Sequence, residues 1–280
     1  MTSLNKHNFK DWIDNSHKRT LIMGILNVTP DSFSDGGKFL SIDSSIKRAL
    51  EMVENGADII DIGGESTRPG SDLVDIKIEI SRIMPVIKKL RNLTDVIISV
   101  DTRKSKVAEQ ALNEGADLIN DVSGLTFDKS MIEVVKQYNC PLVIMHMKGN
   151  PKTMQDNPVY SNIIDEVKFF FKTQIIYAKN NDFDISNIIL DPGIGFGKSF
   201  EDNFHLINNL NQIRVKSHPI LLGSSRKAFL GQDGITNPEN RLAGTAATIA
   251  IGQYNGANIL RVHDVKFMKQ VSQITHRIYH

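Results

Sequence analysis

The sequence predicts a single (β/α)8 TIM barrel whose active site lies at the C-terminal ends of the strands. Three observations predict this fold. Eight short apolar runs recur along the 280 residues, amphipathic helical patterns lie between them, and a weak internal repeat recurs. Eight strand–helix units give about 35 residues each, as a barrel of this kind requires. A doubly wound parallel sheet is the alternative, but no GxGxxG motif follows the first run to support its dinucleotide-binding form.

The eight apolar runs are rich in Ile, Val and Leu and show no polar alternation. This pattern is typical of parallel strands that are covered on both faces. The predicted strands are Leu21–Leu26, Ile59–Ile62, Val96–Val100, Leu118–Ile119, Leu142–Met145, Ile188–Leu190, Ile220–Leu222 and Ile259–Val262.

Helices are predicted between these runs, because apolar residues recur there at spacings of three and four. Pro85 interrupts the second of these patterns, and we expect it to kink or restart that helix. The patterns cover residues 46–53, 76–90, Ser161–Asn180 and Asp264–Ile278.

A weak repeat supports the barrel. Three ten-residue segments each place a glycine shortly before an apolar run, as expected for a helix C-cap that leads into a strand. The segments are NGADIIDIGG at Asn55–Gly64, EGADLINDVS at Glu114–Ser123 and NGANILRVHD at Asn255–Asp264.

Composition limits the class of protein and its partners. Hydrophobic residues make up 40% and charged residues 23%, which indicates a globular chain. The formal net charge of +1 gives no electrostatic case for a nucleic-acid or membrane partner. With Cys140 as the only cysteine and no signal-peptide core or membrane span, we expect a cytoplasmic location. We divide the chain into an N-terminal segment of unclear role, residues 1–20, and a barrel domain, residues 21–280.

Polar residues stand at or just past the ends of the apolar runs, where a (β/α)8 barrel places its active site. We interpret Asp61 and His146 as structural polar residues and the others as candidates for the site. Arg261 and His263 are two residues apart on one strand and therefore face the same side. The strand-end residues are Asn27, Asp61, Asp101, Asn120, His146, Asp191, Lys227, Arg261 and His263.

The segment DPGIGFGKS at Asp191–Ser199 resembles a phosphate loop only superficially. Three residues separate Gly193 from Gly197, whereas a P-loop needs four, so we reject a nucleoside triphosphatase. A carboxylate such as Asp191 at the end of an apolar strand needs paired N–H donors or a basic partner, and Lys227 is a partner of the right type.

Eight motifs occur in order from about Leu21 to the C-terminus, without gaps. They are MGILNVTPDSFSDGG (Met23–Gly37), DIGGESTRPG (Asp61–Gly70), SVDT (Ser99–Thr102), INDVSG (Ile119–Gly124), MHMKGNPKTMQ (Met145–Gln155), DPGIGFGK (Asp191–Lys198), SSRK (Ser224–Lys227) and RVHDV (Arg261–Val265). Together they resemble the dihydropteroate synthase family. The first two motifs are long enough to be highly specific.

The resemblance implies an enzyme that joins 6-hydroxymethyl-7,8-dihydropterin diphosphate to p-aminobenzoate in folate synthesis, releases diphosphate and uses magnesium (Mg2+). It also implies small-molecule substrates and a homodimer formed through barrel helices. The implied pterin site is Asp101, Asn120, Met145, Asp191, Lys227 and Arg261. The implied diphosphate site is Asn27, Thr67, Arg68, Arg261 and His263, with Asn27 also reaching the metal. The implied p-aminobenzoate pocket is Pro30, Phe33, Thr67, Arg68, Pro69, Phe196 and Ser225. The implied catalytic residues are Asp101, Lys227, Arg261 and His263.

The chemistry of the substrates agrees with these roles. A pterin presents its N3–H and 2-amino groups side by side, which matches the two oxygens of the Asp191 carboxylate. An arylamine is already a neutral nucleophile at pH 7, so no strong base is needed. The difficult step is the departure of diphosphate. Because the electron-rich pterin ring stabilises a methylene cation, we favour a dissociative reaction, in which the resemblance places Asp101 near the developing positive charge.

Two alternatives remain open. A methyltransferase that moves a methyl group from methyltetrahydrofolate to a corrinoid would share the pterin carboxylate and asparagine, but would not need Arg261, His263 and the TPDSFSDGG loop. A homologue without catalytic activity would bind a pterin or a partner protein only. A turnover assay separates both from the enzyme.

Overall fold

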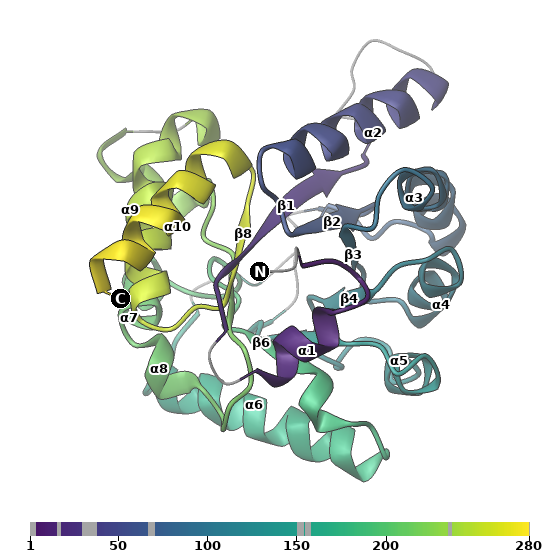
Figure 1. Cartoon of the computed structure of the whole chain (residues 1–280). Coiled ribbons are helices and arrows are strands. Elements are labelled where there is room, and N and C mark those ends of the chain that lie inside the picture. Colours follow the sequence, from purple (N-terminus) through teal and green to yellow (C-terminus); the bar gives the residue numbers. More distant parts are fainter. Residues whose placement is uncertain are drawn as a thin grey trace.

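The computed structural model describes residues 4–15, 18–29, 38–66, 71–149, 154, 158–234 and 237–279. Within these residues, eight parallel strands form one sheet in the order β6-β5-β4-β3-β2-β1-β8-β7. A parallel bridge between Leu190 and Ile220 brings the two edges together, so the sheet curls into a nearly closed barrel (Figure 1). The predicted (β/α)8 barrel is confirmed. The strands are β1 (Leu21–Asn27), β2 (Ile59–Gly63), β3 (Ile97–Asp101), β4 (Leu118–Asp121), β5 (Leu142–Met145), β6 (Ile188–Asp191), β7 (Leu221–Leu222) and β8 (Ile259–Val262).

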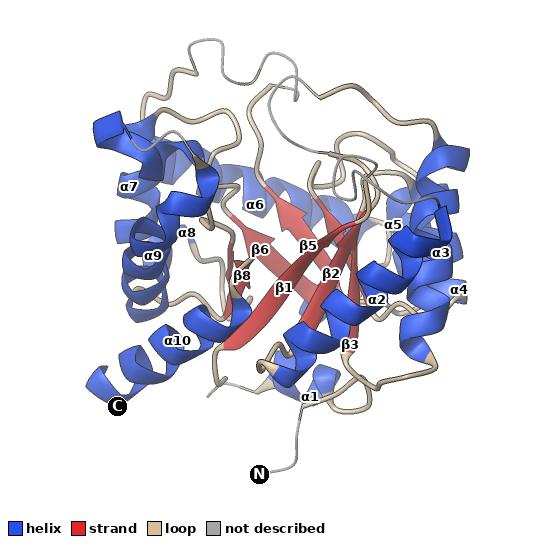
Figure 2. Cartoon of the chain, turned by 90° about the horizontal axis from the view of Figure 1, so that it is seen from above, coloured by secondary structure: helices blue, strands red, loops and turns tan. Residues whose placement is uncertain are grey.

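Helices surround the barrel and cover its outer face (Figures 1 and 2). In the part of the chain that the structure describes, no helix combines the length and the apolar character needed to cross a membrane. The α-helices are α1 (Phe9–Asp14), α2 (Lys38–Glu54), α3 (Ile76–Arg91), α4 (Ser105–Asn113), α5 (Met131–Gln137), α6 (Ile163–Asn180), α7 (Phe200–Asn208), α8 (Leu210–Ile213), α9 (Leu242–Tyr254) and α10 (Val265–Tyr279).

The strands are apolar on both faces because each face packs against a different layer. Ile59 and Ile97 belong to the apolar cluster inside the barrel, whereas their neighbours Ile60 and Ile98 pack with the helices outside. Successive strand residues point to opposite faces, so burial on both sides requires an unbroken apolar run.

Of the two outcomes expected at Pro85, a kink or a restart, the structure excludes the restart, because α3 continues through Pro85 from Ile76 to Arg91. Pro85 is exposed, while Ile83 and Val86 beside it are buried. Proline removes the hydrogen bond to the carbonyl four residues earlier, here that of the exposed Ser81, which water can satisfy.

The repeat predicted from the sequence is confirmed as helix ends that lead into strands. Gly56, Gly115 and Gly256 follow α2, α4 and α9 with φ angles of 95°, 100° and 104°. This left-handed conformation favours glycine over residues with a Cβ.

Helix α1 closes the end of the barrel opposite the active site. Phe9, Trp12 and Ile13 are buried in the inner cluster with residues from the beginnings of the strands, such as Leu21 and Ile59. Figure 2 shows α1 at this end and the long connecting loops at the other. The polar residues predicted at the strand ends therefore lie at the open, C-terminal mouth.

Candidate active site

A cavity at the C-terminal mouth of the barrel is lined by all six residues of the predicted pterin site. Besides the predicted residues, Val122 and Ile194 contribute apolar wall, and Gly193 and Gly223 contribute backbone. The predicted residues that line the cavity are Asp101, Asn120, Met145, Asp191, Phe196, Lys227 and Arg261.

Asp61 holds this site together from below. Its carboxylate is fully buried and accepts hydrogen bonds from Ser99 Oγ at 2.6 Å, Asn120 Nδ2 at 3.2 Å and Arg261 Nε at 2.6 Å. A buried carboxylate is stable only with such donors. Asp61 is the structural residue that the sequence predicted, and it also orients two predicted site residues.

Arg261 bridges two carboxylates at the mouth. Its Nε donates to Asp61, and one terminal nitrogen donates to Asp101 Oδ2 at 2.8 Å. Burial acts to lower the pKa of Arg261, but Asp61 and Asp101 outweigh it and raise the pKa. The guanidinium is therefore a fixed positive charge on the cavity wall.

Asp191 and Asn120 both line the cavity and carry acceptor oxygens. Asp191 Oδ1 accepts a hydrogen bond from the Gly193 N–H at 2.7 Å. Asn120 donates through its nitrogen to Asp61, whereas its Oδ1 atom is buried and has no hydrogen-bond partner among the described residues. A buried acceptor without a donor costs stability, so a ligand N–H at this position gains binding energy.

Burial raises the pKa of both acidic groups in the cavity. The pKa of Asp191 rises to about 6, with the Gly193 N–H and Arg261 opposing the effect of burial. The pKa of Asp101 rises to about 7 because burial, reinforced by Asp61, outweighs the attraction of Arg261. A ligand that donates hydrogen bonds or carries positive charge would stabilise the ionised form of each carboxylate.

Apolar residues form part of the cavity wall. Met145, Val122 and Phe196 form a buried cluster, and the Lys227 ammonium lies 3.9 Å from the centroid of the Phe196 ring. A cation over an aromatic face is electrostatically favourable. The wall therefore offers a flat apolar ligand both a surface for stacking and a cation at its edge.

His263 and Ser225 lie beside the cavity and contact each other. Ser225 Oγ lies 3.0 Å from His263 Nδ1 and accepts the His263 backbone N–H at 3.2 Å. Burial and the charges of Arg261 and Arg226 lower the pKa of His263 to about 3. His263 is thus a neutral imidazole that can donate one hydrogen bond, rather than a cation.

Asn27 lies at the exposed end of β1 and is not among the residues that line the cavity, although its strand partner Gly63 is itself paired with the cavity residue Asp101. The remaining predicted site residues, Pro30, Phe33, Thr67, Arg68 and Pro69, lie outside the described residues.

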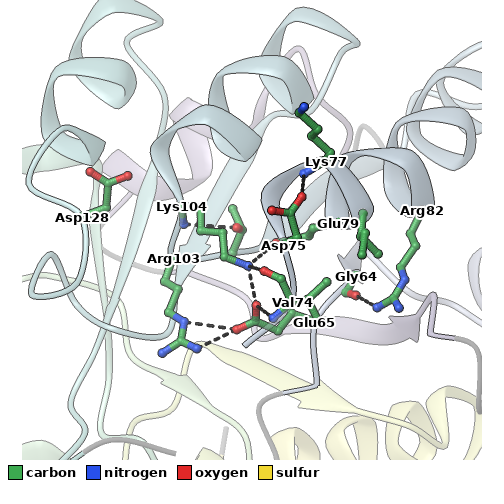
Figure 3. Close-up of polar contacts among 12 residues, drawn as sticks. Gly64, Glu65, Val74, Asp75, Lys77, Glu79, Arg82, Arg103, Lys104 and Asp128 are labelled. Atoms are coloured by element: carbon green, nitrogen blue, oxygen red, sulfur yellow. Dashed lines mark hydrogen bonds and ion pairs between the residues drawn. The ribbon is translucent and has the colours of Figure 1, made fainter. Parts of the chain in front are cut away.

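A buried ion cluster on the β2 and β3 side was not predicted (Figure 3). Lys104 donates to the carboxylates of Glu65 and Glu79 and to the Val74 carbonyl, and Arg103 donates to Glu65 at 2.7 Å. Burial acts to raise the pKa of Glu65, but the hydrogen bonds from Lys104, Val74 and Arg103 outweigh it and lower the pKa. The cluster ties the loop after β2 to the loop after β3.

The carboxylates and the apolar residues that line the cavity fit a flat heterocycle with adjacent N–H donors. A family model described as pterin-binding enzyme matches residues 23–263 of the chain. The chain belongs to this family. Dihydropteroate synthases from Clostridium beijerinckii and a Synechocystis species are 48% and 45% identical to it over 93% and 94% of this chain and 95% and 91% of theirs.

A solved structure supports the same assignment. The dihydropteroate synthase of Clostridium difficile, studied with pteroic acid, superposes with a TM-score of 0.88 at 47% identity and covers 94% of this chain and 97% of its own. The family predicted from the motifs is confirmed, and with it the assignment of the chain to a transferase family.

Within this family assignment, the sequence missed the partners that orient the site. His146 proves to be packed edge-on against Phe170, with ring centroids 5.1 Å apart, as a structural residue would be. Its Nδ1 lies 3.0 Å from the buried ammonium of Lys198, which the motif DPGIGFGK contains but the predicted site omits. A lysine directly after a glycine-rich loop was the available signal.

Proposed function

We propose that the protein condenses 6-hydroxymethyl-7,8-dihydropterin diphosphate with p-aminobenzoate to give 7,8-dihydropteroate and diphosphate. The observation that carries this proposal is the pair of acceptors in the cavity, the Asp191 carboxylate and the unpartnered Asn120 Oδ1. A pterin has N–H donors on one edge, and these acceptors would receive them. Lys227 would donate to the acceptor atoms of the same ring.

The two faces of the pterin would meet different surroundings. Met145 and Phe196 offer apolar contact, and the Arg261 guanidinium, held by Asp61 and Asp101, offers a planar cation. Since Arg261 is fixed before the substrate arrives, little side-chain entropy is lost when the ring binds.

The reaction would begin with departure of diphosphate from the pterin methylene carbon. The bond between that carbon and the diphosphate oxygen breaks, the electron pair leaves with diphosphate, and the amine nitrogen of p-aminobenzoate forms the new bond and then loses a proton. Asp101 would stabilise the positive charge that develops on the pterin. We assign no residue the role of a strong base, because the arylamine is neutral.

The diphosphate would be held by Asn27, Arg261 and His263, together with Thr67 and Arg68 as the family resemblance implies. The neutral His263 would act as a hydrogen-bond donor to a phosphate oxygen. Phe196 and Ser225 would border p-aminobenzoate, with Pro30, Phe33 and Pro69 completing that pocket.

Magnesium is part of the proposal. Among the described residues, no three His, Cys, Asp or Glu side chains cluster as metal ligands, while Asn27 offers one amide oxygen at the exposed end of β1. This donor set fits magnesium, which often binds through one or two protein oxygens and the phosphates of its substrate. When bound, the ion would neutralise charge on the leaving diphosphate.

We also propose a cytoplasmic homodimer. On α9 and α10, which pack against each other, large apolar side chains are exposed, including Tyr254 at 64% and Ile278 at 79%. Exposed apolar side chains on two adjacent helices favour association. Light scattering should give twice the mass of 31.3 kDa, and Phe267→Asp on the same surface should shift the protein toward the monomer.

The central test is calorimetric titration of the pterin diphosphate into Asp191→Asn. The amide places a donor where the pterin also donates, so we expect affinity to fall at least about tenfold. Asp165→Asn, an exposed substitution on α6, is the matched control and should bind normally. Unchanged affinity in Asp191→Asn, or wild-type protein that releases no diphosphate from the two substrates, would contradict the proposal.

A further inference from the structure

The loops after β5 and β6 touch through their backbones. A Cβ atom at Gly193 would overlap the carbonyl oxygen of His146, and one at Gly197 would overlap the carbonyl oxygen of Lys148. Both glycines also have positive φ angles, 65° and 62°. The β6 loop therefore lies directly on the β5 loop, with no side chain between them.

Lys198 joins these two loops from inside. Its side chain is only 2% exposed, and its ammonium lies 3.0 Å from His146 Nδ1, 3.3 Å from the His146 carbonyl oxygen and 3.0 Å from the Phe196 carbonyl oxygen. A protonated amine has three donors, and three acceptors surround it. Because His146 is neutral, its Nδ1 can accept one of these hydrogen bonds.

The contact between Lys198 and Phe196 links Lys198 to the pocket. Lys198 holds the Phe196 backbone through its carbonyl, while the Phe196 ring lies against the ammonium of Lys227. Phe196 and Lys227 both line the cavity with Asp191. A shift of the Phe196 backbone would therefore move the apolar wall and the cation that rests on it.

We propose that Lys198 is a positioning residue for the pterin pocket, which acts through Phe196 to set where the Lys227 ammonium lies relative to Asp191. The proposal rests on the function proposed above. Lys198 is too buried to touch a substrate, so its effect is on the geometry of the residues that do. Displacements of less than an ångström at such contacts lower affinity and rate.

The test compares Lys198→Met, which keeps the length of the side chain but removes the donors, with Tyr160→Phe. Tyr160 donates to the Gly197 carbonyl at 2.6 Å, so it ties the same loop through a different carbonyl from that of Phe196. We expect Lys198→Met to raise the dissociation constant and KM for the pterin diphosphate about tenfold, with a smaller change in kcat. Tyr160→Phe should stay within about twofold of wild type.

A double-mutant cycle tests the route through Phe196. In a Phe196→Leu background, Lys198→Met should add little to the loss of pterin affinity, because the ring that it positions is gone. Lys198→Gln, which keeps two donors, provides a milder second variant with an intermediate loss.

The outcomes separate the two proposals. Wild-type protein that does not bind the pterin diphosphate would refute the proposed function. Wild-type protein that binds, together with a folded Lys198→Met or Lys198→Gln variant of equal affinity, would refute the positioning role alone. Fully additive losses in the double variant would refute the route through Phe196.

Discussion

Two buried lysines lie at different sides of the barrel mouth, and each ties two neighbouring loops together. Lys104, on the β2 and β3 side, meets the carboxylates of Glu65 and Glu79. Lys198, on the β5 and β6 side, meets two carbonyl oxygens and the imidazole of His146, and no carboxylate among the described residues forms an ion pair with it.

The two lysines differ in the charges that surround them. Burial lowers the pKa of Lys198 to about 7, with Lys227 adding to the effect and Asp191 opposing it. Around Lys104, opposite charges are paired, and the pKa of Glu65 is lowered as a result. The same structural role is thus filled once by an ion cluster and once by hydrogen bonds around a lysine that forms no ion pair among the described residues, and the two should respond differently to substitution.

The largest expected effect is on the ion cluster. Lys104→Met leaves two buried carboxylates without their shared cation, which should cost about 3–5 kcal/mol in the free energy of unfolding. Urea denaturation followed by circular dichroism measures this loss. The double variant Lys104→Met with Glu79→Gln should lose less, since one of the two charges is removed. A loss below about 1 kcal/mol in the single variant would show that the carboxylates are solvated or protonated.

The second effect is the pH dependence of Lys198. Its pKa is about 7 in the folded protein and 10.5 ordinarily, so between these values the unfolded chain binds more protons and stability rises with pH. Met at this position cannot titrate. The destabilisation caused by Lys198→Met should therefore grow by about 2 kcal/mol from pH 7 to about pH 9. Urea unfolding of both proteins across this range would contradict the prediction if the two curves stay parallel.

The smallest expected effect concerns a single neutral hydrogen bond in the same region. Tyr160→Phe removes the donor to the Gly197 carbonyl, and water can partly replace it, so the free energy of unfolding should fall by about 0.5–1.5 kcal/mol. Thermal unfolding of the variant at two pH values measures both the loss and its pH dependence. A pH-dependent loss would mean that Tyr160, and not only Lys198, couples to a titrating group.

The ring of strand-end residues was predictable because parallel strands converge at one end of a barrel. In the sequence, Asp101, Asn120 and Asp191 each stand at the end of an apolar run. The ends of these runs meet at the mouth of the barrel, so all three residues line one cavity. The restart that was one of the two outcomes expected at Pro85 does not occur, and the signal was its position on the helix face opposite the buried Ile83 and Ile87.

The side-chain contacts that orient the site could not be predicted from the sequence. Lys104 and Lys198 lie in loops, where no periodicity tells which way a side chain points. Both are charged residues, which are exposed in most proteins, and only the folded loops reveal the acceptors that bury them. Asp61 shows the same limit, because its position was predicted but its three donors come from other strands.

Helix α1 gives the protein an internal optical probe. Trp12 is the only tryptophan, is buried at the closed end of the barrel, and donates its indole N–H to the Arg19 carbonyl at 2.9 Å. The substrate cavity lies at the other end of the strands. Tryptophan fluorescence therefore reports on the closed end of the barrel, and the fluorescence of a bound pterin reports on the open mouth. One sample can thus show whether the two ends unfold together.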